Sequence, residues 1–198
     1  MDGAVAVYRD PDHRLHGDQN RAVLLAGLLV RHGRIGEAIE ELRAFTELPG
    51  NWEDWIVGTL CDLYAEHGRA EDGLAHLDAM KERHGGQEDW ETFGPRLALM
   101  AACGRIDEVA ELACAHPEGD TWYAGWSLSE LLAGAGRAEE ALTVLERHPG
   151  CGTSLRAELL IDLGRIEEAV QVLQQRPQPE PADDPWVNTG ICSTGPPF

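Results

Sequence analysis

The chain has 198 residues, of which 35 are acidic and 16 basic, so its formal net charge is −19. A charge of this size and sign argues against nucleic acid and anionic membranes as partners, because both would be repelled, and it favours neutral or basic partners. Hydrophobic residues make up 43% of the sequence, which is enough to bury a sizeable core without disulfide bonds.

The first segment, residues 1–17, is predicted to be a polar N-terminal arm. It lacks the basic region and long apolar run of a secretory signal, and no part of the chain approaches the roughly 20 apolar residues of a membrane span, so we expect a cytoplasmic protein. Possible metal ligands cluster here, with a plausible spacing between the two histidines: Asp10, Asp12, His13, His16 and Asp18. Because no second pair of ligands completes a site, we expect neither a metal nor a cofactor.

A repeated unit fills residues 18–176. Each copy has an apolar run, then Gly-Arg followed by Ile or Ala, then acidic residues and a second apolar stripe. The copies are LLVRHGRIGEAIEEL, LYAEHGRAEDGLAHL, LMAACGRIDEVAEL, LLAGAGRAEEALTVL and LLIDLGRIEEAVQVL. We call their glycines the marker glycines: Gly33, Gly68, Gly104, Gly136 and Gly164. Successive marker glycines are 35, 36, 32 and 28 residues apart, which scatters around the roughly 34-residue period of helical-hairpin repeats.

Each marker glycine predicts the end of one helix, because the residue after the last turn often adopts a left-handed conformation that costs other residues about 1–2 kcal/mol. Acidic residues then open the next helix, at the positive end of its dipole. The predicted first helices cover 19–32, 52–67, 94–103, 122–135 and 154–163, and the predicted second helices cover 35–46, 70–83, 106–115, 138–147 and 166–175. Pro49, Pro117 and Pro149 fall between hairpins, and Pro95 is predicted at a helix start.

Two sets of positions around the marker glycines carry a family resemblance. Large apolar residues lie four positions before the glycine: Leu29, Tyr64, Met100, Leu132 and Leu160. Small residues lie five positions after it: Ala38, Gly73, Ala141 and Ala169. Residues 18–176 therefore resemble the tetratricopeptide-repeat family, in the degenerate form of actinobacterial proteins with a Gly-Asp-Trp-like entry, here echoed in GNWEDW and EGDTWYAGW. The third unit departs from the pattern, with Val109 at the small position and Ala113 where a large residue is usual.

The resemblance implies an all-α, right-handed solenoid of about five hairpins, which acts as a non-catalytic scaffold and binds a protein or peptide on a concave face lined by the first helices. Two tryptophan pairs open first helices at spacings that share a helix face, Trp52 with Trp55 and Trp122 with Trp126. We consider them as partner-binding residues, although packing against the preceding hairpin is the favoured interpretation of such residues.

Other chemistries have weaker support. The Gly-Arg turns precede helix N-termini that could bind phosphate, but those N-termini already hold carboxylates, so we interpret Arg34, Arg69, Arg105, Arg137 and Arg165 as helix-end ion-pair partners. No HExxH, GxSxG, Walker or GxGxxG motif is present, and we expect no enzyme activity. The five cysteines are odd in number and form no CxxC pair, so we expect reduced and mostly buried thiols.

The tail, residues 177–198, is rich in proline and has no periodicity, so we expect it to be disordered. Trp186, Ile191 and Phe198 could form a docking motif in it, against the alternative of a plain solubilising tail, and Cys192 is its most accessible thiol. An alternative function is regulation by self-association or occlusion, or membership of a larger repeat protein. We expect no helix before residue 18, and a solvated cap formed by the polar run Gln171, Gln174, Gln175 and Arg176.

Overall fold

The computed structural model describes residues 2–9, 19–48, 53–83, 85–86, 88–148 and 152–174. Within these ranges the chain forms eleven α-helices and no β-strand. The helices are α1 (Asp2–Arg9), α2 (Gln19–Arg31), α3 (Ile35–Thr46), α4 (Asp54–Glu66), α5 (Ala70–Arg83), α6 (Trp90–Ala102), α7 (Ile106–Ala115), α8 (Trp122–Gly134), α9 (Ala138–Leu145), α10 (Thr153–Asp162) and α11 (Ile166–Gln174). From α2 onward they pair into five consecutive hairpins, which confirms the predicted all-α solenoid.

Each hairpin turns at a marker glycine. The N–H of Gly33 donates to the carbonyl of Val30, and the N–H of Arg34 donates to the carbonyl of Leu29, both at 2.9 Å. These are the two hydrogen bonds of a Schellman motif, which closes a helix through a left-handed glycine. The same two bonds recur at the other four marker glycines, and all five have φ between 68° and 77°. The turn is therefore local in origin and nearly identical in every hairpin.

Small residues let neighbouring helices approach closely. A Cβ added to Gly73 of α5 would lie 2.9 Å from Cδ1 of Leu99 and 3.1 Å from Cβ of Tyr64, so only hydrogen fits there. The equivalent alanines of α3, α9 and α11 are buried. The third hairpin keeps this register despite its departures from the pattern, because Val109 and Ala113 of α7 are both buried.

The sixth helix begins earlier than predicted. It starts at Trp90 rather than near residue 94, because Asp89 caps it: the side chain of Asp89 accepts hydrogen bonds from the backbone N–H of Thr92 (3.2 Å) and from its hydroxyl (2.7 Å). A side-chain cap of this kind satisfies a backbone donor that the helix itself leaves free. The prediction that Pro95 lies at a helix start was therefore wrong, since Pro95 lies inside α6.

The N-terminal segment differs from the polar arm that we expected. Residues 2–9 form α1, which contacts α2. Val5 is buried, and the guanidinium of Arg21 donates to the backbone carbonyl of Tyr8. The prediction of no helix before residue 18 was therefore wrong. Val5 and the partly buried Tyr8 thus join the core, while Val7 is exposed.

Several predictions fall on residues outside the described ranges. These are the metal-like cluster at Asp10, Asp12, His13, His16 and Asp18, the first tryptophan Trp52, and the tail residues Trp186, Ile191, Cys192 and Phe198. The polar run that we expected to cap the last hairpin is described only as far as Gln174.

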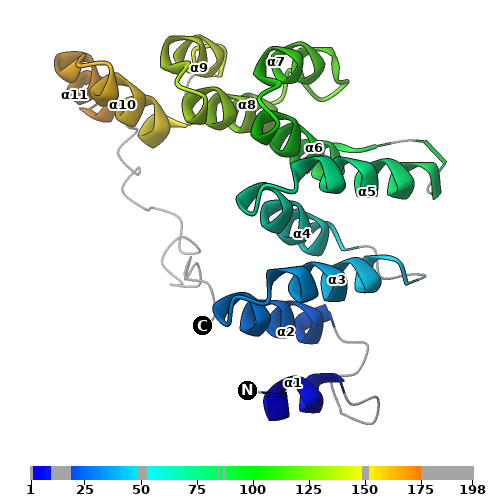
Figure 1. Cartoon of the computed structure of the whole chain (residues 1–198). Helices are drawn as coiled ribbons and strands as arrows, with labels where there is room; N and C mark the ends of the chain where they lie inside the picture. The colour runs from blue at the N-terminus through cyan, green and yellow to red at the C-terminus, as the bar shows by residue number, and fades with distance from the viewer. Residues whose placement is uncertain are drawn as a thin grey trace, which may run out of the picture.

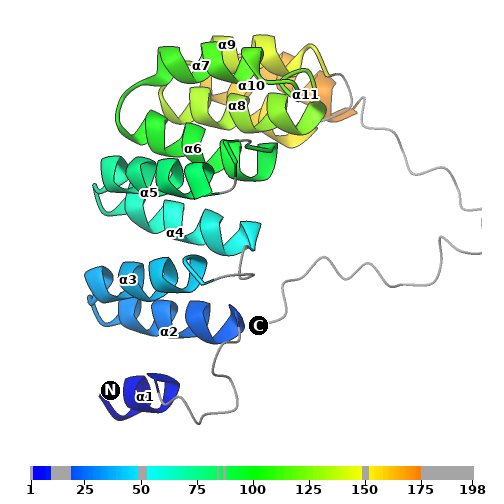
Figure 2. The same cartoon turned by 90° about the vertical axis from the view of Figure 1, so that its right-hand side faces the viewer.

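The hairpins stack into a curved column (Figures 1 and 2). Figure 1 shows α1 to α5 rising as one stack and the hairpins from α6 onward turning aside across its top. Helices α4 and α8 lie toward the inside of this bend, while α5, α7 and α9 lie toward the outside. Helix α6 contacts both α4 and α8. The first helices of these hairpins thus share one layer, whose free side looks into the bend.

Candidate functional site

The free side of the first helices of the last four hairpins is the candidate site, and we call it the inner face. The first helix of the first hairpin, α2, carries the exposed Arg31 and is not part of it. The inner face consists of the exposed side chains of α4, α6, α8 and α10. Residues three, four, seven or eleven apart on a helix share one face. The following residues do so within each helix: Trp55, Asp62 and Glu66 on α4, Glu91 and Ala102 on α6, Trp122, Trp126 and Glu130 on α8, and Ser154, Glu158 and Asp162 on α10. The inner face thus combines carboxylates with indole rings.

Charge on the inner face has one sign. Every exposed charged residue on α4, α6, α8 and α10 is acidic. Partial burial raises the pKa of Asp62 above its ordinary value, and the neighbouring Glu66 raises it further. Burial also raises the pKa of Glu130. None of these three carboxylates has an ion pair within the described part of the chain. A nearby cation would therefore stabilise their charged forms.

Tryptophan side chains stand on the helices that flank α6. Trp55 on α4 is 43% exposed, and Trp122 and Trp126 on α8 are 57% and 40% exposed. The ring of Trp122 contacts that of Tyr123 edge to face, with centroids 5.7 Å apart. A Cβ added to Gly152 would lie 3.6 Å from Cδ1 of Trp126, so this ring lies beside the start of α10. Large parts of all three rings remain open to a partner.

Between the tryptophan-bearing helices, α6 presents small residues. Gly94, Ala98 and Ala102 are spaced four residues apart and so share one side of the helix. We call these three residues the small-residue stripe of α6. None of them has a long side chain that could lie between Trp55 and Trp126. On its inner face α6 therefore presents Glu91 and small residues, between the two helices that carry Trp55 and Trp126.

The carboxylates of the inner face were not identified from the sequence, although a signal for them exists. Asp62, Glu130 and Glu158 each lie six residues before a marker glycine, where the first and third units have Gly27 and Ala98. This position recurs on the free side of each first helix. Aligning the five units on their marker glycines and comparing the charged positions shows that three of the five units have a carboxylate at this position.

Basic residues are concentrated at the hairpin turns, where they form ion pairs. The guanidinium of Arg137 donates two hydrogen bonds of 2.6 Å to Glu140 in its own hairpin and one of 2.5 Å to Asp107 in the preceding hairpin. Arg165 likewise donates to Glu168 (2.7 Å) and to Glu139 of the preceding hairpin (3.3 Å).

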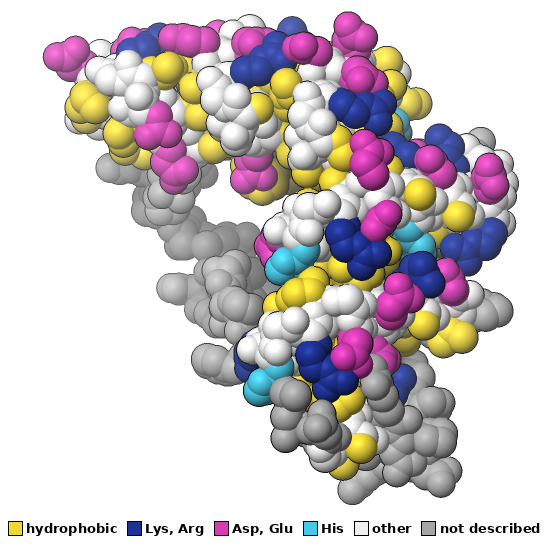
Figure 3. Space-filling view, viewed as in Figure 1, with side chains coloured by type: hydrophobic (Ala, Val, Ile, Leu, Met, Phe, Trp, Pro, Cys, Tyr) yellow, Lys and Arg dark blue, Asp and Glu magenta, His cyan; other side chains and the backbone are white. Residues whose placement is uncertain are grey.

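The arginine after every marker glycine pairs with the carboxylate three residues later. On the face shown in Figure 3, basic side chains accordingly lie beside acidic ones. The hydrogen bonds from Arg137 lower the pKa of Glu140. These guanidiniums are occupied by the protein's own carboxylates, which disfavours a phosphate site at the turns.

Solved structures resemble this arrangement of hairpins. The crystal structure of BtubC (BKLC) from P. vanneervenii matches with a TM-score of 0.51 and 15% identity, over 88% of this chain and 84% of that chain. This chain has a tetratricopeptide-like fold. A mutant of MamA matches with a TM-score of 0.39 and 17% identity, over 79% of this chain and 88% of that chain. YrrB, described as a TPR protein with an unusual peptide-binding site, matches with a TM-score of 0.39 and 17% identity, over 80% and 84%. No family model and no curated protein matches the sequence.

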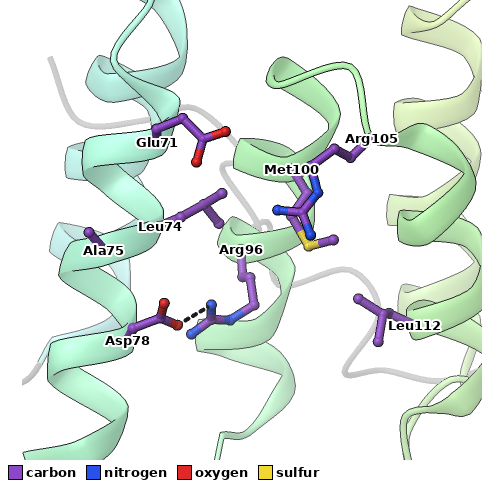
Figure 4. A pocket seen from close by; sticks show the side chains of 8 residues that line it. All are labelled: Glu71, Leu74, Ala75, Asp78, Arg96, Met100, Arg105 and Leu112. Carbon is purple, nitrogen blue, oxygen red and sulfur yellow. Dashed lines mark hydrogen bonds and ion pairs between the residues drawn. The ribbon is translucent and has the colours of Figure 1, made fainter.

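On the outer side of the tetratricopeptide-like stack, a pocket of about 390 Å³ opens between α5, α6 and α7 (Figure 4). Its lining consists of Glu71, Leu74, Ala75, Asp78, Arg96, Met100, Arg105 and Leu112. The guanidinium of Arg96 is bound by Asp78 (2.7 Å), as Figure 4 shows, and by the buried side chain of Glu88 (2.8 Å). The titratable side chains of the lining are Glu71, Asp78, Arg96 and Arg105, and Asp78 is held in the ion pair with Arg96.

A second pocket, of about 360 Å³, lies on the other side of α5 and includes Tyr64 and His76 in its lining. His76 is buried and lies 3.2 Å from the hydroxyl of Thr46, measured from Nε2. Burial lowers the pKa of His76, which favours a neutral ring at physiological pH. The contact with Thr46 indicates that His76 has a structural role, because it joins α3 to α5.

The described cysteines are only partly as expected. Cys61 is buried, Cys103 is half-buried and Cys114 is exposed, and none of the three forms a disulfide. Burial raises the pKa of Cys61 to about 12, so this thiol stays protonated and unreactive. In the described ranges no three His, Cys, Asp or Glu side chains are grouped as metal ligands would be. Among the described helices, none combines the length and the apolar character that crossing a bilayer requires.

Proposed function

We propose that this chain is a non-catalytic scaffold that binds a basic protein segment on its inner face. The observation that carries the proposal is the uniform sign of the exposed charge on α4, α6, α8 and α10. The arginines at the turns are neutralised by carboxylates close to them, so they do not offset the negative potential of the inner face. A surface of this kind attracts cationic partners and speeds their encounter.

The exposed tryptophans supply the second requirement of a binding surface, which is apolar area for a partner to cover. Trp55 and Trp126 border the small-residue stripe of α6 on opposite sides. Indole rings are enriched among the residues that dominate binding energy, and their faces also attract lysine and arginine side chains. We therefore infer that the preferred partner segment alternates basic and apolar residues.

A direct test uses a fluorescein-labelled peptide of alternating lysine and leucine, with a glutamate and leucine peptide as its charge-reversed counterpart. Fluorescence anisotropy is measured with the full chain at low and at high salt. The inner-face variant combines Asp62→Asn, Glu66→Gln and Glu130→Gln. Its matched control combines Glu82→Gln, Glu111→Gln and Glu167→Gln, which remove the same charge from exposed sites on second helices.

We expect the lysine peptide alone to bind, with an affinity that falls as salt screens the charges. The inner-face variant should bind about tenfold more weakly, while the control stays within about twofold of the natural chain. Circular dichroism melting curves establish that both variants are folded. Equal losses in the two variants would mean that net charge alone drives binding, and a lysine peptide that does not bind would refute the proposal.

A further inference from the structure

The last helix exposes an apolar stripe, and two of its three residues have buried counterparts in α3, α5 and α9. Ile166, Val170 and Leu173 of α11 lie on one side of the helix and are each about half exposed, at 52%, 46% and 48%. We call these three residues the terminal stripe. Gln171 and Gln174, the described part of the predicted polar cap, are also exposed on α11, so polar and apolar side chains share its surface.

Equivalent residues of the preceding hairpins show what such a stripe normally does. Six positions after the marker glycine, the second helices α3, α5 and α9 have Ile39, Leu74 and Leu142 where α11 has Val170. Nine positions after it, they have Leu42, Leu77 and Leu145 where α11 has Leu173. All six of these equivalents are at most 7% exposed. The terminal stripe therefore has the composition of a buried interface.

In each earlier hairpin the helix that follows in the chain packs against the second helix. Helix α3 is packed against α4, α5 against α6, α7 against α8, and α9 against α10. The segment that follows α11 begins at residue 175 and runs to residue 198. We propose that this tail folds back on α11 and covers the terminal stripe, with Trp186 and Ile191 as its apolar contacts.

The length of the tail permits this contact. The terminal stripe extends about 12 Å back along α11 from Gln174, at 1.5 Å per helical residue. Trp186 lies twelve residues beyond Gln174, and an extended chain of that length reaches about 40 Å. A tethered segment also meets its target at an effective concentration in the millimolar range.

A second copy of the chain is a poorer occupant, because two molecules of net charge −19 repel each other. The terminal stripe itself borders Glu167 and Glu168 at the start of α11. Two stripes facing one another would bring these carboxylates together. The tail also carries acidic residues, Glu180, Asp183 and Asp184, but it is tethered to α11 and supplies Trp186, a residue that can bury roughly 150–250 Å² of surface.

The test is hydrogen–deuterium exchange of the α11 amides in the full-length chain. The tail variant combines Trp186→Ala and Ile191→Ala, and its matched control combines Asn188→Ala and Thr189→Ala in the same segment. We expect the α11 amides to exchange about tenfold faster in the tail variant than in the natural chain or the control, because covering a helix suppresses its local opening. Exchange of the α2 amides should be unchanged.

A reciprocal variant tests the same contact from the other side. Replacing Val170 and Leu173 together by asparagine should speed amide exchange in residues 185–192. Equal α11 exchange in the natural chain, the tail variant and the control would overturn the proposal. It would also be overturned if α11 protection rose with protein concentration and did not depend on the tail residues, since a second copy would then cover the terminal stripe.

Discussion

Gly134 and Gly136 lie two residues apart and face different conformational demands. Gly136 has φ of +77° in the turn between α8 and α9, while Gly134 is the last residue of α8 and has no positive φ. A Cβ added at either position would meet nothing within 4 Å. Any difference between alanine substitutions at the two sites therefore comes from the backbone and not from packing.

We predict that Gly136→Ala lowers the free energy of unfolding by about 1–2 kcal/mol, because alanine disfavours the left-handed conformation. Gly134→Ala should raise it by about 0.5 kcal/mol, since alanine restricts the unfolded chain and fits the helix. Urea unfolding of both variants measures the two changes. Equal changes in unfolding free energy for the two variants would contradict the conclusion that the left-handed conformation at position 136 requires glycine.

At the scale of the helices, the stack depends on buried apolar contacts. Leu145 of α9 is 2% exposed, and a Cβ added to Gly152 would lie 2.9 Å from its Cδ2, so the contact between α9 and α10 is tight. The ion pairs between hairpins, such as Arg137 with Asp107, lie at the surface. Exposed pairs contribute about 0–1 kcal/mol each. They therefore help to align neighbouring hairpins and are not the main source of stability.

Leu145→Asp should therefore reduce the free energy of unfolding by about 3 kcal/mol or more, because it buries an unpaired charge and removes apolar contacts. Thr143→Asp, at an exposed position of the same helix, is the matched control and should cost less than about 1 kcal/mol. Thermal and urea unfolding compare the two variants. If Leu145→Asp melted at the same temperature as the natural chain, the placement of Leu145 in the core would be contradicted.

At the scale of the whole molecule, the acidic inner face predicts how binding depends on pH. Burial raises the pKa of Asp62 and of Glu130 in the free protein, and a bound cation would lower both by stabilising the charged carboxylates. Binding then releases protons. The affinity is highest above the raised pKa values of the free protein and falls as the pH decreases through them.

The lysine and leucine side chains of the peptide do not titrate between pH 5 and pH 7. With a label of constant charge in place of fluorescein, a change in affinity over this interval reports on the protein. We expect binding to weaken from pH 7 to pH 5, as measured by anisotropy at constant ionic strength. The double variant Asp62→Asn, Glu130→Gln should lose most of this dependence. An unchanged slope in that variant would assign the effect to other groups.

The helix ends show how far local rules reach. The marker glycines and the carboxylates after them predicted where α3, α5 and α7 start, because a Schellman turn and a helix start involve only neighbouring residues. The start of α6 was missed because the Asp89 cap precedes the repeated pattern. Helix α1 was missed because its burial depends on the first hairpin, which lies further along the chain.

The sequence by itself determined the order of helices from α2 onward, the positions of the turns and the excess of negative charge, since these follow from residues close together in the chain and from composition. The tertiary structure alone decided which carboxylates remain unpaired, how far Trp55, Trp122 and Trp126 are exposed, and that the stripe of α11 lies open. These features depend on contacts between hairpins about 30 residues apart and on the direction in which the column bends, and no local pattern encodes either.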